Sequence, residues 1–216
     1  MPNPVKPFFL VLEGVDFSGK TTLRERIVEW LRTVIPNEVV VTREPGGTPF
    51  AEEIREVLLK PRDEVVEPMA ELLGFMCGRR QHVEMMIRPK LELGSVVVSD
   101  RFVDSSFTMQ CWATDGGVSL DKFFQLEELV LDGFRPDALI YLDIDPAVSM
   151  QRQLNAGRSK DRIEAKGLDY HQAIREGFLD RYENQSVGGK IRIIDASQTA
   201  DEVFEQAKQF LIEHFV

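Results

Sequence analysis

The sequence predicts an α/β fold in which helices cover both faces of a mostly parallel sheet. Short apolar runs of strand length recur along the chain, and segments with the 3.6-residue periodicity of amphipathic helices separate them. The first four runs do not alternate cleanly between polar and apolar residues, so we expect those strands to be buried on both faces. Regular alternation of strands and helices is typical of βαβ units. The five runs are residues 8–12, 39–42, 95–99, 138–142 and 191–194.

A glycine loop follows the first predicted strand and precedes a helix with one apolar face. Gly14 and Gly19 stand at the P-loop spacing, with Lys20 and Thr21 directly after them. The glycines allow consecutive N–H groups to point at a polyphosphate, and the positive end of the helix faces the same anion. We expect Lys20 to reach the β and γ oxygens and Thr21 to hold Mg²⁺. The predicted nucleotide-binding residues are Gly14, Val15, Asp16, Phe17, Ser18, Gly19, Lys20, Thr21 and Thr22.

Length and composition restrict the class of protein. A chain of 216 residues favours one compact domain, and a net charge of −10 argues against nucleic acid or an anionic membrane as partner. An anionic small substrate must then be met by a few local arginines. Cys77 and Cys111 match no metal-binding spacing, so both are interpreted as small core residues. No apolar run is long enough for a signal peptide or a membrane span, and we expect a cytoplasmic protein.

The loop after the second strand places an arginine where ligands gather in parallel sheets. Arg43 ends the strand, and Pro45 with two following glycines makes a tight turn. An ordinary surface arginine is the competing interpretation. A helix is predicted over residues 51–59, followed by a polar connector over residues 60–67.

A long helical pattern covers residues 68–93, with Pro68 in its first turn and Pro89 expected to kink its end. Within it, Phe75 and Arg79 are four residues apart and therefore share one face. Phe75 could belong to the core, or the pair could hold a base by stacking and hydrogen bonding.

Charged residues also end the third strand. Asp100 stands where a P-loop protein carries its Walker-B carboxylate, and Arg101 beside it could neutralise a transferring phosphoryl group. A buried structural ion pair is the alternative. A helix is expected over residues 104–110, where Ser105 could cap the helix or bind a substrate.

The last third of the chain is predicted to be mostly helical. The helix at residues 120–131 has more apolar surface than one core face needs, so it could also pack on a partner subunit. The basic stretch 155–164 could be a solvated loop, or a flap that closes over a triphosphate. Further helices are expected at residues 147–154, 170–183 and 201–215.

Taken together, these motifs resemble those of thymidylate kinases, the bacterial type most closely, over essentially the whole chain. The string from Thr42 to Thr48 is much more specific than the P-loop. The matching segments are the P-loop with Asp16, residues 42–48, Phe75 with Arg79, Gln81 and His82, residues 99–102, Ser105 with Gln110, and residues 161–164.

The resemblance implies a P-loop NTPase fold, with three αβα layers around a five-stranded parallel sheet. It implies one domain over residues 1–216, with a lid at about residues 155–167 inside it. It also implies transfer of the γ-phosphoryl group of ATP to dTMP with Mg²⁺, and a homodimer.

Residue roles follow from the same resemblance. It implies that Lys20, Arg101, Arg158 and Arg162 are catalytic, because they would stabilise charge in the transition state. Thr21 and Asp100 would hold the metal, Phe75 would stack on thymine, Arg79 would bond its O4, and Asp16 would contact the sugar 3′-hydroxyl or the metal shell. Arg43 and Arg101 would hold the acceptor phosphate. The implied substrate-binding residues are Asp16, Arg43, Phe75, Arg79, Arg101, Ser105, Ser106, Met109 and Gln110.

Three departures from the pattern of the family affect four positions. Phe17 replaces a glycine or an arginine in the P-loop, which places more of the charge on the flap residues Arg158, Lys160 and Arg162. Met109 replaces a tyrosine beside the sugar, and Thr108 and Cys111 replace an alanine and a glycine. A flexible thioether excludes a 2′-hydroxyl less sharply than a rigid ring. Two alternatives remain open at this point: a kinase for another deoxynucleoside monophosphate such as dUMP, and a nucleotide-binding switch without an acceptor.

Overall fold

The computed structural model describes residues 4–114, 117–156, 166–185 and 187–216. Within these residues the strands form one five-stranded sheet, all parallel, in the order β2-β3-β1-β4-β5. The five predicted runs are therefore confirmed as strands of one parallel sheet. Their bounds are β1 Phe9–Gly14, β2 Val39–Arg43, β3 Val96–Asp100, β4 Ala138–Asp143 and β5 Lys190–Asp195.

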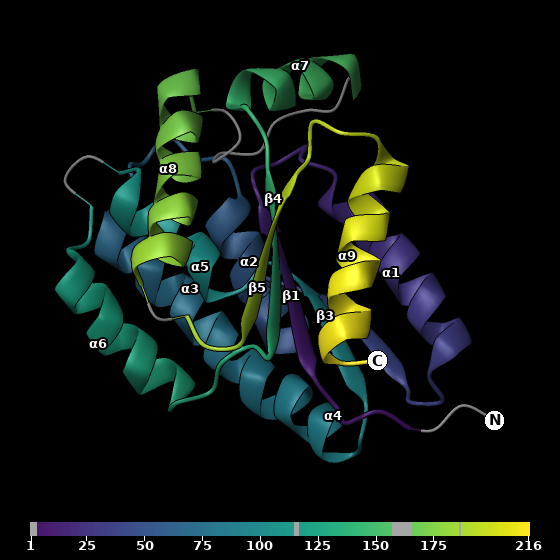
Figure 1. Ribbon diagram of the computed structural model, residues 1–216. Coiled ribbons are helices and arrows are strands. Elements are labelled where there is room, and N and C mark those ends of the chain that lie inside the picture. The colour runs from purple at the N-terminus through teal and green to yellow at the C-terminus, as the bar shows by residue number, and fades with distance from the viewer. Residues whose placement is uncertain (1–3, 115–116, 157–165, 186) are drawn as a thin grey trace.

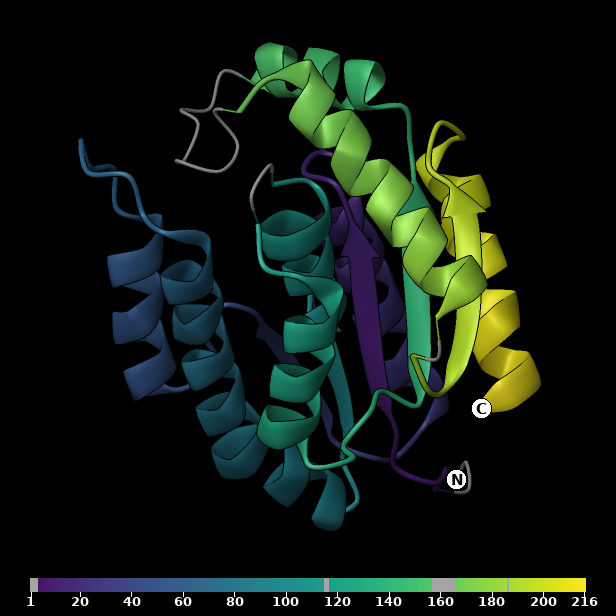
Figure 2. The same ribbon diagram turned by 90° about the vertical axis from the view of Figure 1, so that its left-hand side faces the viewer.

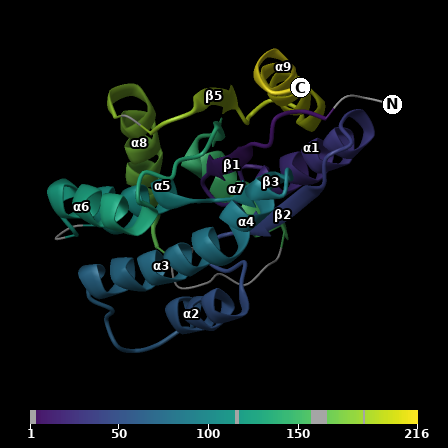
Figure 3. The same cartoon turned by 90° about the horizontal axis from the view of Figure 1, so that it is seen from below.

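Helices cover both faces of the sheet, which gives the three αβα layers of a P-loop NTPase (Figure 1). α1 (Lys20–Val34) and α9 (Ala200–His214) lie side by side on one face, and α3, α6 and α8 lie on the other (Figures 1 and 3). α2 packs on the outer side of α3 (Figure 3). The remaining bounds are α2 Pro49–Leu59, α3 Pro68–His82, α4 Arg88–Glu92, α5 Val103–Ser106, α6 Leu120–Leu131, α7 Pro146–Ala156 and α8 Leu168–Asn184.

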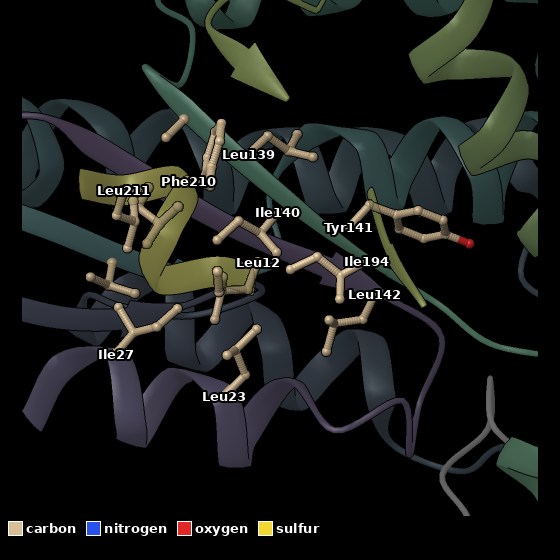
Figure 4. Close-up of a cluster of buried hydrophobic side chains, with 14 of the residues drawn as sticks. Leu12, Leu23, Ile27, Leu139, Ile140, Tyr141, Leu142, Ile194, Phe210 and Leu211 are labelled. Atoms are coloured by element: carbon tan, nitrogen blue, oxygen red, sulfur yellow. The ribbon is translucent and has the colours of Figure 1, made fainter. Parts of the chain in front are cut away.

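The central strand β1 builds both halves of the core because successive side chains of a strand point to opposite faces. Leu10 and Leu12 belong to the cluster that includes residues of α1 and α9, as Figure 4 shows around Leu12, Leu23 and Ile27. Phe9 and Val11 belong to the opposite cluster, with residues of α3 and α6. All of β1 is buried, as expected for a central strand of a parallel sheet.

The prediction that the first four strands are buried on both faces is wrong for β2. β2 is an edge strand that pairs only with β3 among the described strands, and Val41 is 41% exposed. The run from Val39 to Thr42 is three valines and a threonine, and such a short apolar run carries no information on whether a further strand covers its far edge. Strand order comes from long-range packing.

Two predicted helices contain a change of winding. The predicted helix over residues 68–93 is α3, a π-helical segment η1 (Val83–Ile87) and α4, with Pro89 in the first turn of α4. The helix predicted over residues 104–110 is α5 followed by a second π-helical segment, η2 (Phe107–Trp112). Hydrophobic periodicity does not separate these windings over five or six residues.

The two cysteines differ in environment. Cys111 is buried, as predicted, whereas Cys77 on α3 is exposed, so the prediction that both lie in the core is wrong. Cys77 is on the outer side of a helix whose buried face is formed by other residues, including Leu72 and Met76.

A buried ion cluster joins α8 to α5 and α6. Arg181, which is 1% exposed, donates from Nε to Asp104 at 2.9 Å and from Nη2 to Glu127 at 2.7 Å. Its guanidinium also lies against the rings of Phe107 and Phe124. Both acids are buried, so they need Arg181 as their hydrogen-bond donor. The cluster therefore fixes how α8 packs against α5 and α6.

The carboxyl ends of the strands form the end of the sheet that carries the glycine loop and α7 (Figure 2). The start of β1 and the C-terminus lie at the opposite end (Figure 2). None of the helices in the described part of the chain is long and apolar enough to cross a membrane.

The Arg181 cluster makes a stability prediction. Arg181→Met leaves Asp104 buried without its cation and Glu127 with only the more distant Arg135 at 4.0 Å, and we expect the free energy of unfolding to fall by about 3–5 kcal/mol. Lys208→Met is the control, because Lys208 pairs with Glu205 on the surface and should contribute about 0–1 kcal/mol. Urea denaturation measures both. An Arg181→Met loss no larger than that of the control would contradict the assignment.

Candidate active site

A cavity of about 880 Å³ opens at the carboxyl ends of the strands, between the glycine loop, α3 and the turn after β3. It brings Arg43, Arg79 and Arg101, which come from three separate segments, into one space with Lys20. The predicted residues that line it are Asp16, Phe17, Ser18, Gly19, Lys20, Thr21, Thr22, Arg43, Phe75, Arg79, Asp100, Arg101, Ser105, Ser106, Met109 and Gln110.

Two of the predicted site residues that the structure describes do not line this cavity. Gly14 and Val15 begin the glycine loop, and their carbonyl oxygens accept hydrogen bonds from Lys20. Arg158 and Arg162, with Lys160 of the same predicted flap, lie outside the described residues.

The glycine loop needs backbone conformations that side chains disfavour. Gly14 has φ 148° and Gly19, directly before α1, has φ 103°. A Cβ on Gly14 would lie 2.8 Å from Ser18 Oγ and 2.9 Å from the carbonyl oxygen of Leu142. Phe17 also has a positive φ, 59°, which confirms that the loop is tightly wound at the position where the family pattern is broken.

The interior of the loop is prepared for an anion. Lys20 Nζ donates to the carbonyl oxygens of Gly14 and Val15, both at 2.9 Å, and an ammonium has a third donor to offer. Burial lowers the pKa of Lys20, and the nearby Arg101 adds to that effect. Ser18 Oγ is buried and has no hydrogen-bond partner in the part of the chain that the structure describes. A ligand oxygen would satisfy both groups.

Arg101 links the turn after β3 to the glycine loop. Its Nη2 donates to Asp16 Oδ1 at 2.7 Å, and its Nη1 donates to Ser105 Oγ at 2.9 Å. Burial opposes ionisation of Asp16, but the charges of Arg101 and Lys20 outweigh it and lower the pKa of Asp16 to about 2. Asp100 also lines the cavity and faces Arg24 Nη1 at 3.6 Å.

Arg79 on α3 also lines the cavity, and several hydrogen bonds hold its guanidinium in place. It is 3% exposed, and its Nε donates to Glu44 Oε2 at 2.7 Å while its Nη2 donates to the Phe102 carbonyl and to Ser106 Oγ, both at 3.0 Å. Burial works against the Glu44 charge, but Arg79 and His82 lower the pKa of Glu44. Phe75, one turn earlier on α3, is 8% exposed and lines the same cavity.

The other predicted substrate-binding residues differ in their exposure to solvent. Met109 and Gln110 are presented by the π-helical segment η2, where Gln110 Nε2 donates to Glu71 at 3.0 Å. Arg43 is more open: its side chain is 46% exposed and pairs with Glu52 at 2.8 Å. Arg43 can therefore turn toward a ligand more easily than Arg79.

The cavity also contains residues that sequence reasoning missed. Arg152 on α7 donates to the Ala196 carbonyl at 3.0 Å, and Ala196 with Gln198 from the loop after β5 lines the same end. Glu44 and Arg55 complete the other end. Glu44 lies inside a string that was already singled out. Arg152, Ala196 and Gln198 could have been found only from strand order, since β4 and β5 bring α7 and the loop after β5 next to the glycine loop.

Comparisons with known proteins agree with the resemblance to thymidylate kinases. The family model described as thymidylate kinase matches residues 12–207. A thymidylate kinase of Clostridium novyi is 38% identical over 210 residues, which is 95% of this chain and 98% of that protein. One of Symbiobacterium thermophilum is 40% identical over 206 residues, 95% of this chain and 92% of the relative. The crystal structure of thymidylate kinase from Ehrlichia chaffeensis superposes with a TM-score of 0.69 at 28% identity, covering 98% of this chain and 99% of that chain.

Gly14 provides a test of the loop. Gly14→Ala places a Cβ against a backbone oxygen at an unfavourable φ, so we expect a loss of about 1 kcal/mol or more in stability. Because the clash displaces Ser18 as well, ATP binding should weaken roughly tenfold or more, since a hydrogen bond to a charged group contributes about 1.5–3 kcal/mol.

Gly94→Ala is the matched control, because Gly94 also has a positive φ of 87° but nothing lies within 4 Å of its added Cβ. It should lose stability and keep its ATP affinity. Thermal unfolding and calorimetric titration with ATP separate the two effects. Unchanged ATP affinity in Gly14→Ala would contradict the role of the loop.

Proposed function

The chain belongs to the thymidylate kinase family, and from that premise we propose that it transfers the γ-phosphoryl group of ATP to dTMP, forming dTDP and ADP. One observation carries the proposal: a single cavity unites the phosphate-binding loop and Lys20 with three arginines from other segments. Two phosphorylated molecules that meet in one space need this arrangement, because their charges must be shielded from each other.

ATP fits the end of the cavity formed by the glycine loop. The β- and γ-phosphates suit the N-terminus of α1, Lys20 and the Ser18 hydroxyl, which finds no partner among the residues that the structure describes. Thr21 and Asp100 are the residues that would hold Mg²⁺, which neutralises charge on the phosphate oxygens when bound. Thr22, Arg152 and Gln198 extend this end toward a nucleobase.

The acceptor fits the other end. Phe75 and Arg79 both line it, and in the proposed complex Phe75 would stack on thymine and Arg79 would bond its O4. Arg43 and Arg101 would bind the acceptor phosphate, and Asp16 would contact the sugar 3′-hydroxyl or the metal shell. Ser105, Ser106, Met109 and Gln110 complete the walls.

The chemistry then requires little from the protein beyond position and charge. An oxygen of the acceptor phosphate attacks the γ-phosphorus, and the bond from that phosphorus to the β–γ bridging oxygen breaks, releasing ADP. The nucleophile is already anionic, so no general-base histidine is needed. Lys20 and Arg101, with Arg158 and Arg162 of the proposed lid at about residues 155–167, would stabilise the charge that spreads over the transferred group.

A homodimer is proposed as the assembly of this single-domain chain. Exposed apolar side chains lie on neighbouring helices: Val57 on α2 (60% exposed), Leu73 on α3 (47%) and Leu129 on α6 (76%). Burying them against a second copy would remove apolar surface from water. Analytical ultracentrifugation should show twice the chain mass, and Leu129→Glu should shift it toward the monomer; a monomeric wild type would contradict the proposal.

The acceptor panel tests the proposed reaction. With ATP and Mg²⁺, we expect dTMP to be phosphorylated with the highest kcat/KM, and dUMP roughly tenfold more slowly because it lacks one methyl group. UMP, dCMP and dGMP should be slower still. A coupled assay for ADP measures all five. Another monophosphate as best acceptor would favour the alternative kinase, and equal ADP release without any acceptor would favour a nucleotide switch.

The lid arginines make a separate prediction. Arg158→Ala and Arg162→Ala should each lower kcat by roughly 100-fold, as loss of one transition-state donor does, with a smaller change in ATP affinity. Arg192→Ala, an exposed arginine on β5 outside the cavity, is the control and should keep its kcat. A loss confined to ATP affinity would remove Arg158 and Arg162 from the catalytic role.

A further inference from the structure

Glu13 is a fully buried acid directly behind the active site. It is the last residue but one of β1, its exposure is 0%, and it does not line the cavity. Its Oε1 accepts hydrogen bonds from the backbone N–H groups of Phe102 at 2.8 Å and Ser105 at 3.2 Å. Its Oε2 accepts from Ser105 Oγ at 2.7 Å. One carboxylate therefore binds the whole turn that follows β3.

That turn holds Arg101 in a backbone conformation that arginine disfavours. Arg101 has φ 72°, and a non-glycine residue in this region costs about 1–3 kcal/mol unless its surroundings maintain it. The Arg101 N–H donates to the Leu12 carbonyl at 2.9 Å, and Ser99 Oγ donates to the Arg101 carbonyl at 2.8 Å. The Glu13 bond to Phe102 fixes the next peptide, so Arg101 is clamped on both sides.

The same acid also reaches the guanidinium. Arg101 Nη1 lies 3.7 Å from Glu13 Oε2 and donates to Ser105 Oγ, which in turn donates to Glu13. Asp16 holds the other nitrogen, Nη2, at 2.7 Å from the cavity side. The guanidinium is thus held between an acid in the site and an acid behind it.

We infer that Glu13 is a positioning residue for phosphoryl transfer, acting through Arg101: it maintains the strained backbone of Arg101 and orients its guanidinium into the cavity. The inference rests on the proposed function, because Arg101 is the residue through which it acts. Burial raises the pKa of Glu13 to about 7, opposed by the charge of Arg101. Strongly shifted pKa values cluster at functional sites, so the raised pKa of this carboxyl group favours a functional role over a purely stabilising one.

The plain alternative is that Glu13 only caps the short helix α5, and Glu13→Gln separates the two roles. A glutamine keeps one oxygen for the N–H groups of Phe102 and Ser105, so the cap survives. Its amide nitrogen must then face Arg101 Nη1, which places a donor against a donor, and Ser105 Oγ must accept a hydrogen bond where it donated one to Glu13. If Glu13 only caps α5, Glu13→Gln should leave kcat unchanged. If Glu13 positions Arg101, the same substitution should lower kcat.

The experiment compares wild type, Glu13→Gln, Arg101→Ala and the double variant. We expect Glu13→Gln to keep its melting temperature and its KM for ATP and to lose tenfold to roughly 100-fold in kcat, the effect of a misplaced catalytic group. In the Arg101→Ala background the same substitution should lower kcat by less than about threefold, because the residue through which Glu13 acts is gone. A kcat of Glu13→Gln within about twofold of wild type, or a full loss in both backgrounds, would overturn the inference.

Glu127→Gln is the matched control. Glu127 is also a buried carboxylate with a 2.7 Å bond from an arginine, but it lies outside the cavity lining, and its substitution should leave kcat unchanged. An equal loss in Glu127→Gln would overturn the inference as well. If Glu13→Gln does not fold, Ser105→Ala breaks the same link while keeping the Glu13 bonds to the backbone, and its loss of kcat should likewise vanish without Arg101.

The acceptor is the one that wild type phosphorylates fastest in the panel. If dTMP is not a substrate, the proposed function is wrong. The ratio of kcat between the variants, measured with the best acceptor, still tests the role of Glu13.

Discussion

The parallel pairing of β1 with β3 is the constraint on which the site depends. Leu12 pairs with Asp100 in register, so the glycine loop and the turn that carries Arg101 leave the sheet side by side. From that register, Asp16 and Arg101 meet at 2.7 Å although they are 85 residues apart in sequence. A slip of one residue would turn every side chain of a strand to the other face, and the core on both sides prevents it.

A second feature is that three of the arginines that line the cavity are already paired with an acid. Arg101 is paired with Asp16, Arg79 with Glu44, and Arg43 with Glu52. In a protein of net charge −10, anion binding therefore depends on local placement and not on a general positive field. Glu44 and Asp16 hold the guanidinium groups of Arg79 and Arg101 in place before a ligand arrives, which is the preorganisation that charge stabilisation requires. They also keep the cations from repelling one another.

The two π-helical segments fit the same picture. η2 presents Met109 and Gln110 to the cavity, while η1 follows the end of α3 that carries Arg79 and His82. Such segments shift side chains relative to a regular helix and are frequent at functional sites. In η2 the change of winding thus falls where Met109 and Gln110 line the cavity.

The sequence alone determined the parallel α/β class, the glycine loop and most of the residues that line the cavity, because those signals are local. Strand length, glycine spacing and arginines at strand ends can be read within about ten residues. Only the tertiary structure decided that β2 is an edge strand, that Arg152 and Gln198 join the cavity, and that Glu13 stands behind Arg101. Each of these depends on which segments distant in the chain become neighbours, and that is decided by packing of the whole core and not by any short stretch.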